Sequence, residues 1–323
     1  WWVMEQQPGP VNWAPYNPAP LPGMVRLWAI EAAAHGAEVV SYFRWRQADF
    51  AQEQMHAGLK RPDDAPAPGL AEAQQLAAEL QAMPDVAPAQ AAVALLFDYP
   101  SAWAWDVLPQ GADFDYFRLM FETYRALRRQ GLSVDILPAD TPALSGYQLI
   151  LAPGLATLPD GLATRLVDSD AVCLLGPRTN LVTADLTIPL PMGPNLPGLD
   201  TTVTQVESLP PQTARAAEGQ GTLRHWMETL EGDAPVRLRL QNGAPLLVGH
   251  DTLNYLAGWP DSDLWDAVLA LLASEANLPR TPLPDGLRLR ATATHDFAFN
   301  YAPEPILWRG TTLPPAGVAW WER

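Results

Sequence analysis

Cysteine is almost absent from this chain, and no long apolar run occurs in it. The 323 residues include one cysteine, Cys173, which excludes an internal disulfide and a zinc site built from several cysteines. The apolar stretches are typified by residues 91–97, far short of the roughly 18 residues that a membrane-spanning helix needs. We therefore expect no membrane span, no metal site within the chain and no cofactor.

Positive charge is also scarce. Twenty Lys and Arg residues stand against 36 Asp and Glu residues, which leaves a net charge of -16. Proteins bind nucleic acid by neutralising its phosphates with Lys and Arg. This composition therefore excludes a nucleic-acid partner, and it disfavours an anionic membrane surface for the same reason.

Proline and tryptophan are the abundant residues, with 34 and 13 copies. Many prolines indicate many rigid loops and element ends. Tryptophan near loops suits a carbohydrate site, because sugar rings present apolar C–H faces. Apolar residues make up 48% of the chain, enough for cores in about two domains with room for a small third.

The first 83 residues predict two strand–helix units. We expect strands at residues 1–5 and 38–45, and helices at 24–35 and 70–83. A long loop follows each strand, on the side that holds the active site in parallel α/β barrels. The apolar start at Trp1 indicates a fragment that begins inside a strand, so no signal peptide is visible; the compartment is unknown, and the cytoplasm is favoured.

The amino-acid composition changes near residues 84–88, and such a change indicates a domain boundary. Strands and helices then alternate in a pattern that predicts a doubly wound parallel sheet. The expected strands are 91–99, 132–137, 147–152 and 171–175, and the helices are 115–130, 161–167 and 262–272.

Three further segments complete the expected organisation. Residues 187–232 are Pro-rich and predicted irregular, and residues 236–249 predict a hairpin across Asn242-Gly243. Residues 287–301 alternate like antiparallel strands. The predicted domains are residues 1–88, 89–282 and 283–323.

Five residues of the first domain could carry chemistry, and their positions alone leave alternatives open. Glu5 ends the first predicted strand. It could be a catalytic group there, or simply a carboxylate exposed to solvent. Glu53 and His56 share a loop at i, i+3 spacing, where they could bind hydroxyls, hold a metal or simply lie at the surface. Trp13 and Phe43 could be core residues or platforms for a sugar.

Three motifs in this region resemble the β-galactosidases of glycoside hydrolase family 42. They are MEQQPGPVNWAPYNP at Met4–Pro18, HGAEVVSYFRWRQA at His35–Ala48 and QEQMHAGL at Gln52–Leu59. The similarity continues more loosely through residues 98–105 and 114–137.

The resemblance implies a retaining glycosidase on a (β/α)8 barrel. Its nucleophile is the Glu of the MEQQPG motif at the end of barrel strand seven, here Glu5. In the family, the residues matching Trp13 and Phe43 shape the galactose subsite, and those matching Glu53 and His56 hydrogen-bond sugar hydroxyls. The expected substrate is a terminal β-D-galactoside.

The family's acid/base is missing from this chain. It is the Glu of an Asn-Glu pair at the end of barrel strand four, and retaining hydrolysis needs both carboxyl groups roughly 5–5.5 Å apart. None of the eight asparagines is followed by Glu (residues 12, 17, 180, 195, 242, 254, 277 and 300). We expect this chain to hold the last two barrel units and to be inactive alone.

Residues 89–282 resemble the family's trimerisation domain, whose fold is similar to flavodoxin-like glutamine amidotransferases. This implies a homotrimer, with a small antiparallel β domain after it. A rival hypothesis makes Cys173 an amidotransferase nucleophile, but Cys173 lies in an apolar run without a glycine elbow, which favours a buried structural thiol. The alternative function is an inert oligomerisation fragment.

Overall fold

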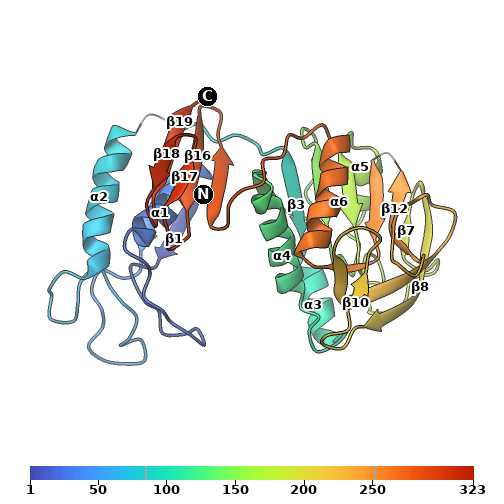
Figure 1. Ribbon diagram of the computed structural model, residues 1–323. Coiled ribbons are helices and arrows are strands. Elements are labelled where there is room, and N and C mark those ends of the chain that lie inside the picture. Colours follow the sequence, from blue (N-terminus) through green and yellow to red (C-terminus); the bar gives the residue numbers. More distant parts are fainter. Residues whose placement is uncertain (84–85, 251) are drawn as a thin grey trace. The chain divides into compact units, whose positions relative to one another are not determined.

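The chain has an α/β fold that divides into two compact units (Figure 1). The computed structural model describes residues 1–83, 86–250 and 252–323. The first unit comprises residues 1–90 and 283–323, and the second comprises residues 91–282. Residues 84 and 85, at the predicted domain boundary, lie outside the described residues.

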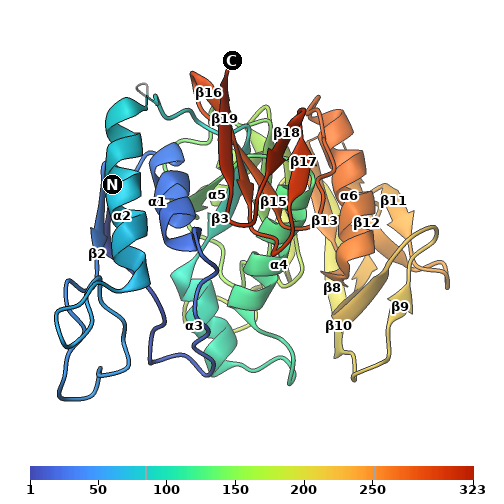
Figure 2. The same ribbon diagram turned by 60° about the vertical axis from the view of Figure 1, so that its left-hand side comes forward.

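The first unit begins with the two predicted strand–helix pairs. Strand β1 (Trp2–Gln6) pairs in parallel with β2 (Val39–Tyr42), and each is followed by a helix, α1 (Met24–Ala34) or α2 (Pro68–Ala82). Helix α2 starts with a proline, whose missing N–H costs nothing in the first turn of a helix. The two helices pack against each other (Figure 2). This arrangement places the loops that follow β1 and β2 at the same end of the strand pair.

The C-terminal strands belong to the same unit. Strands β15 (Leu287–Ala291), β16 (His295–Asn300) and β19 (Val318–Glu322) form an antiparallel sheet, beside a hairpin of β17 (Ile306–Trp308) and β18 (Thr311–Leu313). Phe297 and Phe299 of β16 share a core with Leu27 and Ile30 of α1. Residues 283–323 therefore share their core with the strand–helix pairs.

The second unit is built around a seven-stranded mixed sheet. Five strands run parallel in the order β4-β3-β5-β6-β13, and β12 and β11 extend the sheet antiparallel. The hairpin predicted across Asn242-Gly243 is confirmed as β11 and β12. The strands are β3 (Val93–Phe97), β4 (Val134–Pro138), β5 (Leu149–Ala152), β6 (Val172–Leu175), β11 (Val236–Arg239), β12 (Pro245–His250) and β13 (Leu253–Leu256).

Helices cover both faces of this sheet, as the alternation of strands and helices predicts. Val93 and Leu95 of β3 face the core shared with α3 (Tyr99–Val107), α4 (Tyr116–Arg129) and α6 (Ser262–Glu275). Their neighbours Ala94 and Leu96 face the core shared with α5 (Leu162–Val167). Strand residues alternate between faces, so continuous apolar strands such as β3 are buried on both sides.

The prediction that residues 187–232 are irregular is wrong. This segment holds two ten-residue strands, β8 (Leu199–Ser208) and β10 (Thr222–Glu231), which pair antiparallel. They form a second sheet with β7 (Pro194–Leu196), β9 (Arg215–Ala216) and β14 (Gly258–Pro260). The strands are rich in Thr and Glu because one side of each faces solvent, which weakens the apolar signal that a buried strand gives.

Helix α3 is also absent from the predicted elements. Its start has a clear signal, because the Asp98 carboxylate accepts a hydrogen bond from the Ser101 amide at 2.7 Å. Asp98 is thus the N-cap, and Pro100 lies in the first turn, where proline is tolerated. The aromatic residues that follow conceal the helix, since Trp and Tyr are weak helix formers.

Candidate active site

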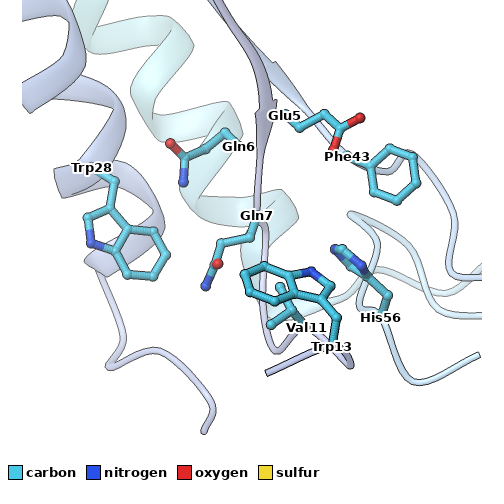
Figure 3. A pocket seen from close by; sticks show the side chains of 8 residues that line it. All are labelled: Glu5, Gln6, Gln7, Val11, Trp13, Trp28, Phe43 and His56. Atoms are coloured by element: carbon cyan, nitrogen blue, oxygen red, sulfur yellow. The ribbon is translucent and has the colours of Figure 1, made fainter. Parts of the chain in front are cut away.

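A pocket of about 220 Å³ opens at the carboxyl end of β1 (Figure 3). Four of the five predicted site residues line it, and Glu53 does not. The lining residues are Glu5, Gln6, Gln7, Val11, Trp13, Trp28, Phe43 and His56.

Strand pairing brings Glu5 and Phe43 together. The parallel register sets Gln6 opposite Tyr42, and the Phe43 amide donates to the Gln6 carbonyl at 3.1 Å. Successive strand residues point to opposite sides, so the Glu5 side chain lies on the side of Phe43 while Gln6 lies on the side of Trp28 (Figure 3). The Glu5 carboxylate is solvent-exposed, which leaves it free to reach a ligand.

His56 forms a buried wall of the pocket. Its residue surface is only 6% exposed, and its imidazole contacts the Phe43 ring edge to face with the centroids 5.1 Å apart. Neither ring nitrogen has a hydrogen-bond partner among the described residues. Buried polar atoms are nearly always hydrogen-bonded, and leaving them unpaired is costly. An imidazole in this state is suited to binding a ligand hydroxyl.

Glu53 is held beside the pocket by an ion pair with Arg44. The Arg44 guanidinium also lies over the Phe43 ring, 4.5 Å from its centroid. One cation therefore contacts two of the residues that the sequence assigns to sugar binding. In this conformation the Glu53 carboxylate is half exposed and points toward Arg44.

Trp13 is the most exposed aromatic side chain of the pocket, at 74%. It lies on the loop after β1, beside His56 (Figure 3). An exposed indole presents an apolar face with a polar N–H at its edge. That combination can stack on one face of a sugar.

The sequence did not single out the other lining residues as candidates. Gln6 and Gln7 directly follow Glu5 in the MEQQPG motif, and this adjacency was the available signal. Trp28 comes from α1, where its helical spacing with Met24 and Ala32 made it indistinguishable from a core residue. Val11 has no chemistry of its own to reveal it.

The surroundings of Cys173 do not suit a catalytic nucleophile. It is the second residue of β6, fully buried, with its sulfur 3.6 Å from the Ser169 hydroxyl. Burial raises the pKa of this thiol to about 11, so the thiolate that a nucleophile needs is disfavoured. The expected structural thiol is confirmed.

Neither a metal cluster nor a membrane-spanning helix occurs in the part of the chain that the structure describes. No three or more His, Cys, Asp and Glu side chains gather there in a way that could hold a metal ion. Within the same residues, no helix combines the length and the apolar character needed to cross a membrane.

Two family models match successive parts of this chain. Residues 91–279 match the family model described as the β-galactosidase trimerisation domain, and residues 1–83 match the β-galactosidase model. The chain belongs to glycoside hydrolase family 42. Family members are hydrolases of the glycosidase class.

The family 42 relatives are similar over nearly the whole chain. A β-galactosidase, BgaA, of a Thermus species is 48% identical over 99% of this chain and 52% of its own length. The β-galactosidase of Thermus thermophilus is 49% identical over 94% of this chain and 48% of its own length. The chain thus spans about half the length of these relatives.

Solved structures agree with the fold. The β-galactosidase of the psychrophilic Marinomonas ef1 covers all of this chain with a TM-score of 0.93 and 41% identity. The enzyme of the Antarctic haloarchaeon Halorubrum lacusprofundi covers it with a TM-score of 0.90 and 35% identity. In both cases 53% of the solved chain is matched.

Proposed function

We propose that this chain supplies the nucleophile half of a retaining β-galactosidase active site. In this proposal residues 1–83 are the last two units of the (β/α)8 barrel, and Glu5 is the nucleophile. The observation that carries the proposal is the convergence of Glu5, Trp13, Phe43 and His56 on one pocket.

The chemistry requires a carboxylate that first attacks and then leaves. Glu5 attacks the anomeric carbon of the galactoside and forms a covalent glycosyl ester, while an acid protonates the departing oxygen. Water, activated by the same acid/base, then releases galactose with retention. Glu5 is the single carboxylate among the described residues that line the pocket, so the acid/base comes from residues outside this chain.

The other site residues orient the sugar. His56 pairs its free ring nitrogens with galactose hydroxyls, and Glu53 joins it by exchanging Arg44 for the sugar. Phe43 and Trp13 enclose the apolar ring faces. A site built to hydrogen-bond particular hydroxyls rejects an epimer strongly, because the wrong sugar leaves these polar groups unpaired.

The second unit, with its flavodoxin-like strand order, is proposed to join three copies of the chain. A second candidate function, an oligomerisation module without catalysis, is favoured by the single carboxylate in the pocket. The two candidates differ in whether Glu5 is used when an acid/base is present.

A hybrid enzyme tests the proposal. The half of the Thermus BgaA relative that precedes the matched region is joined to this chain, and hydrolysis of an aryl β-galactoside is measured. We expect Glu5→Ala to abolish turnover, since no carboxylate can then attack. Sodium azide, which fits the space left by the side chain, should restore the reaction and give the α-galactosyl azide.

The matched control is Glu304→Ala, which removes another exposed carboxylate of the same unit and should leave the rate unchanged. If Glu5→Ala retained most of its activity without azide, the nucleophile assignment would be wrong. If the hybrid folds but is inactive, the result favours the second candidate function, an oligomerisation module without catalysis.

A further inference from the structure

Six apolar side chains of the second unit stand out from its surface on neighbouring elements. Each is 55–63% exposed. We call this set the aromatic face: Tyr99, Trp103 and Val107 of α3, Phe117 and Phe121 of α4, and Ile136 of β4.

The aromatic face is continuous. Phe97 lies between its two helices, with its ring centroid 4.9 Å from that of Tyr99 and 5.4 Å from that of Phe117. Trp103 follows Tyr99 by one helical turn, with the ring centroids 6.1 Å apart. Side chains four residues apart share one side of a helix, so Val107 and Phe121 prolong the face along α3 and α4.

An outward helix face normally carries charged residues, and none of the six side chains of the aromatic face is charged. On α4 the exposed Arg125, one turn after Phe121, ends the apolar side. Asp106 is the single charged residue of α3. With roughly 100 Å² exposed on each large side chain, the face presents on the order of 600 Å². That approaches the ~800 Å² that each partner contributes to a typical stable interface, and apolar patches of this size mark interaction sites.

A second apolar feature lies in the same unit. Residues 186–192, with the sequence LTIPLPM, carry no charge, and Ile188 and Leu190 are 70% and 87% exposed. Leu186 and Met192 are also exposed, so every second residue offers an apolar side chain. Pro189 and Pro191 restrict the backbone, which lowers the entropy lost when such a segment docks.

The two features flank one cavity. This cavity of about 830 Å³ is lined by Tyr99 and Ile136 of the aromatic face, and by Val182 and Thr183 at the root of the exposed segment. We propose that residues 186–192 of one copy pack on the aromatic face and cavity of the next copy. The proposal rests on the homotrimer proposed above and names its contact surface.

A second copy is the occupant that these features fit. Two different surfaces that fit each other give a head-to-tail contact, which closes into a ring when the rotation allows it. Copies with a net charge of -16 repel each other, so they must meet where acid is scarce. The side chains of both features are uncharged, although Asp98, Asp140 and Asp160 line the cavity between them. Both features lie in residues 91–279, which match the trimerisation model.

The oligomeric state of the full chain tests the surface. Light scattering should report a trimer for the wild type. Trp103→Glu and Ile188→Glu should each give monomers whose circular dichroism is unchanged, because both side chains are exposed. Val206→Glu, at an exposed position on β8, is the matched control and should remain trimeric.

The outcomes separate the two proposals. A monomeric wild type refutes the homotrimer and this contact together. A trimer that withstands both glutamates refutes this contact alone.

Cross-linking tests which surface meets which, and it does not depend on destabilising the protein. Cys173 is buried, so Trp103→Cys and Ile188→Cys each introduce one reactive thiol. Co-expressed and treated with a short bis-maleimide, the two variants should give a two-chain product that neither gives alone. A product from Trp103→Cys alone, or none from the mixed trimer, would refute the head-to-tail contact.

Discussion

At the scale of single residues, the site combines an exposed carboxylate with a buried imidazole that makes no hydrogen bond to the described residues. His56 has both ring nitrogens unpaired among the described residues, although the side chain is buried against Phe43. Such a group lowers stability and is retained where a ligand will satisfy it. The free energy of unfolding and the affinity for sugar should therefore respond to it in opposite directions.

His56→Phe tests this trade-off. Phenylalanine keeps the edge-to-face contact with Phe43 and removes two unpaired polar atoms, so the free energy of unfolding should rise by about 1 kcal/mol. In the hybrid enzyme the same change should raise KM for galactosides. Urea denaturation at neutral pH measures the first effect; a loss of stability instead would mean that the imidazole is already satisfied in the folded chain.

Glu228 is a second buried group with a measurable signature. Its carboxylate accepts hydrogen bonds from the Tyr255 hydroxyl at 2.7 Å and the Arg178 amide at 2.9 Å. Burial nevertheless raises the pKa of Glu228 above its usual value near 4.5. The folded state therefore binds this proton more tightly than the unfolded state, and stability is lost as pH rises above 4.5.

Glu228→Gln should remove that pH dependence. The free energy of unfolding of the variant, relative to wild type, should increase between pH 4.5 and pH 7.5. Urea denaturation at both pH values provides the measurement, and Glu231→Gln, an exposed position on the same strand, provides the control. A relative stability that fell as pH rose would show that the charged carboxylate stabilises the fold.

The site could be predicted from sequence only where motif and position coincided. Glu5 ends a strand and stands in a recognisable motif, so its place in the pocket was predictable. Glu53 stands in an equally clear motif, yet it contacts Arg44 instead of the pocket, because pairing depends on side-chain conformations that spacing does not reveal. Trp28 lines the pocket from α1, but the helical spacing of the apolar residues in α1 indicated that Trp28 was a core residue.

At the scale of elements, the sequence marked the ends of helices clearly, but it did not reveal the second sheet, whose main strands are β8 and β10. The strands β3, β5 and β6 are continuous apolar runs and were predicted. Strands β8 and β10 alternate Thr and Glu with apolar residues, and prolines before and between them suggested irregular structure. A 13-residue connection separates the two strands along the chain. Their pairing therefore depends on tertiary contacts, which the local sequence pattern does not reveal.

The cap of α6 makes an element-scale prediction. The Asp261 carboxylate accepts hydrogen bonds from the Leu264 amide at 2.9 Å and the Thr222 hydroxyl at 2.7 Å. Burial acts to raise the pKa of Asp261, but these hydrogen bonds outweigh it and hold the pKa below the usual 3.8. The cap therefore stabilises the fold above that pH and loses its effect as pH falls through the depressed pKa.

Asp261→Ala should lower the free energy of unfolding by about 1–2 kcal/mol at pH 7. The loss should shrink as pH is lowered below 3.8, and urea denaturation across that range would follow it. Asp263→Ala, at an exposed position in the first turn of the same helix, should cost only a few tenths of a kcal/mol. Equal losses for the two variants at pH 7 would contradict the capping role.

At the scale of the whole molecule, the chain has two separate parts. One unit contains a pocket with one carboxylate, and the other matches a trimerisation domain. Strand β1 pairs only with β2 in the described residues, which leaves one edge without hydrogen-bond partners. Trp1, Trp2 and Met4 are more than half exposed at this edge. We predict that Glu5, the nucleophile proposed above, is held on this strand less firmly than catalysis requires.

The most direct measurement is aryl β-galactoside hydrolysis by four proteins: the 323-residue chain, the hybrid with the Thermus half, and the Glu5→Ala variant of each. An aryl leaving group needs little protonation, which makes this the most lenient substrate for a site without its acid. We predict aryl alcohol release by the hybrid alone, because the isolated chain holds Glu5 on a strand with one unpaired edge among the described residues and so does not position it well enough to attack. Release by the isolated chain above that of its own Glu5→Ala variant would contradict the account, because it would show that these residues form a complete site.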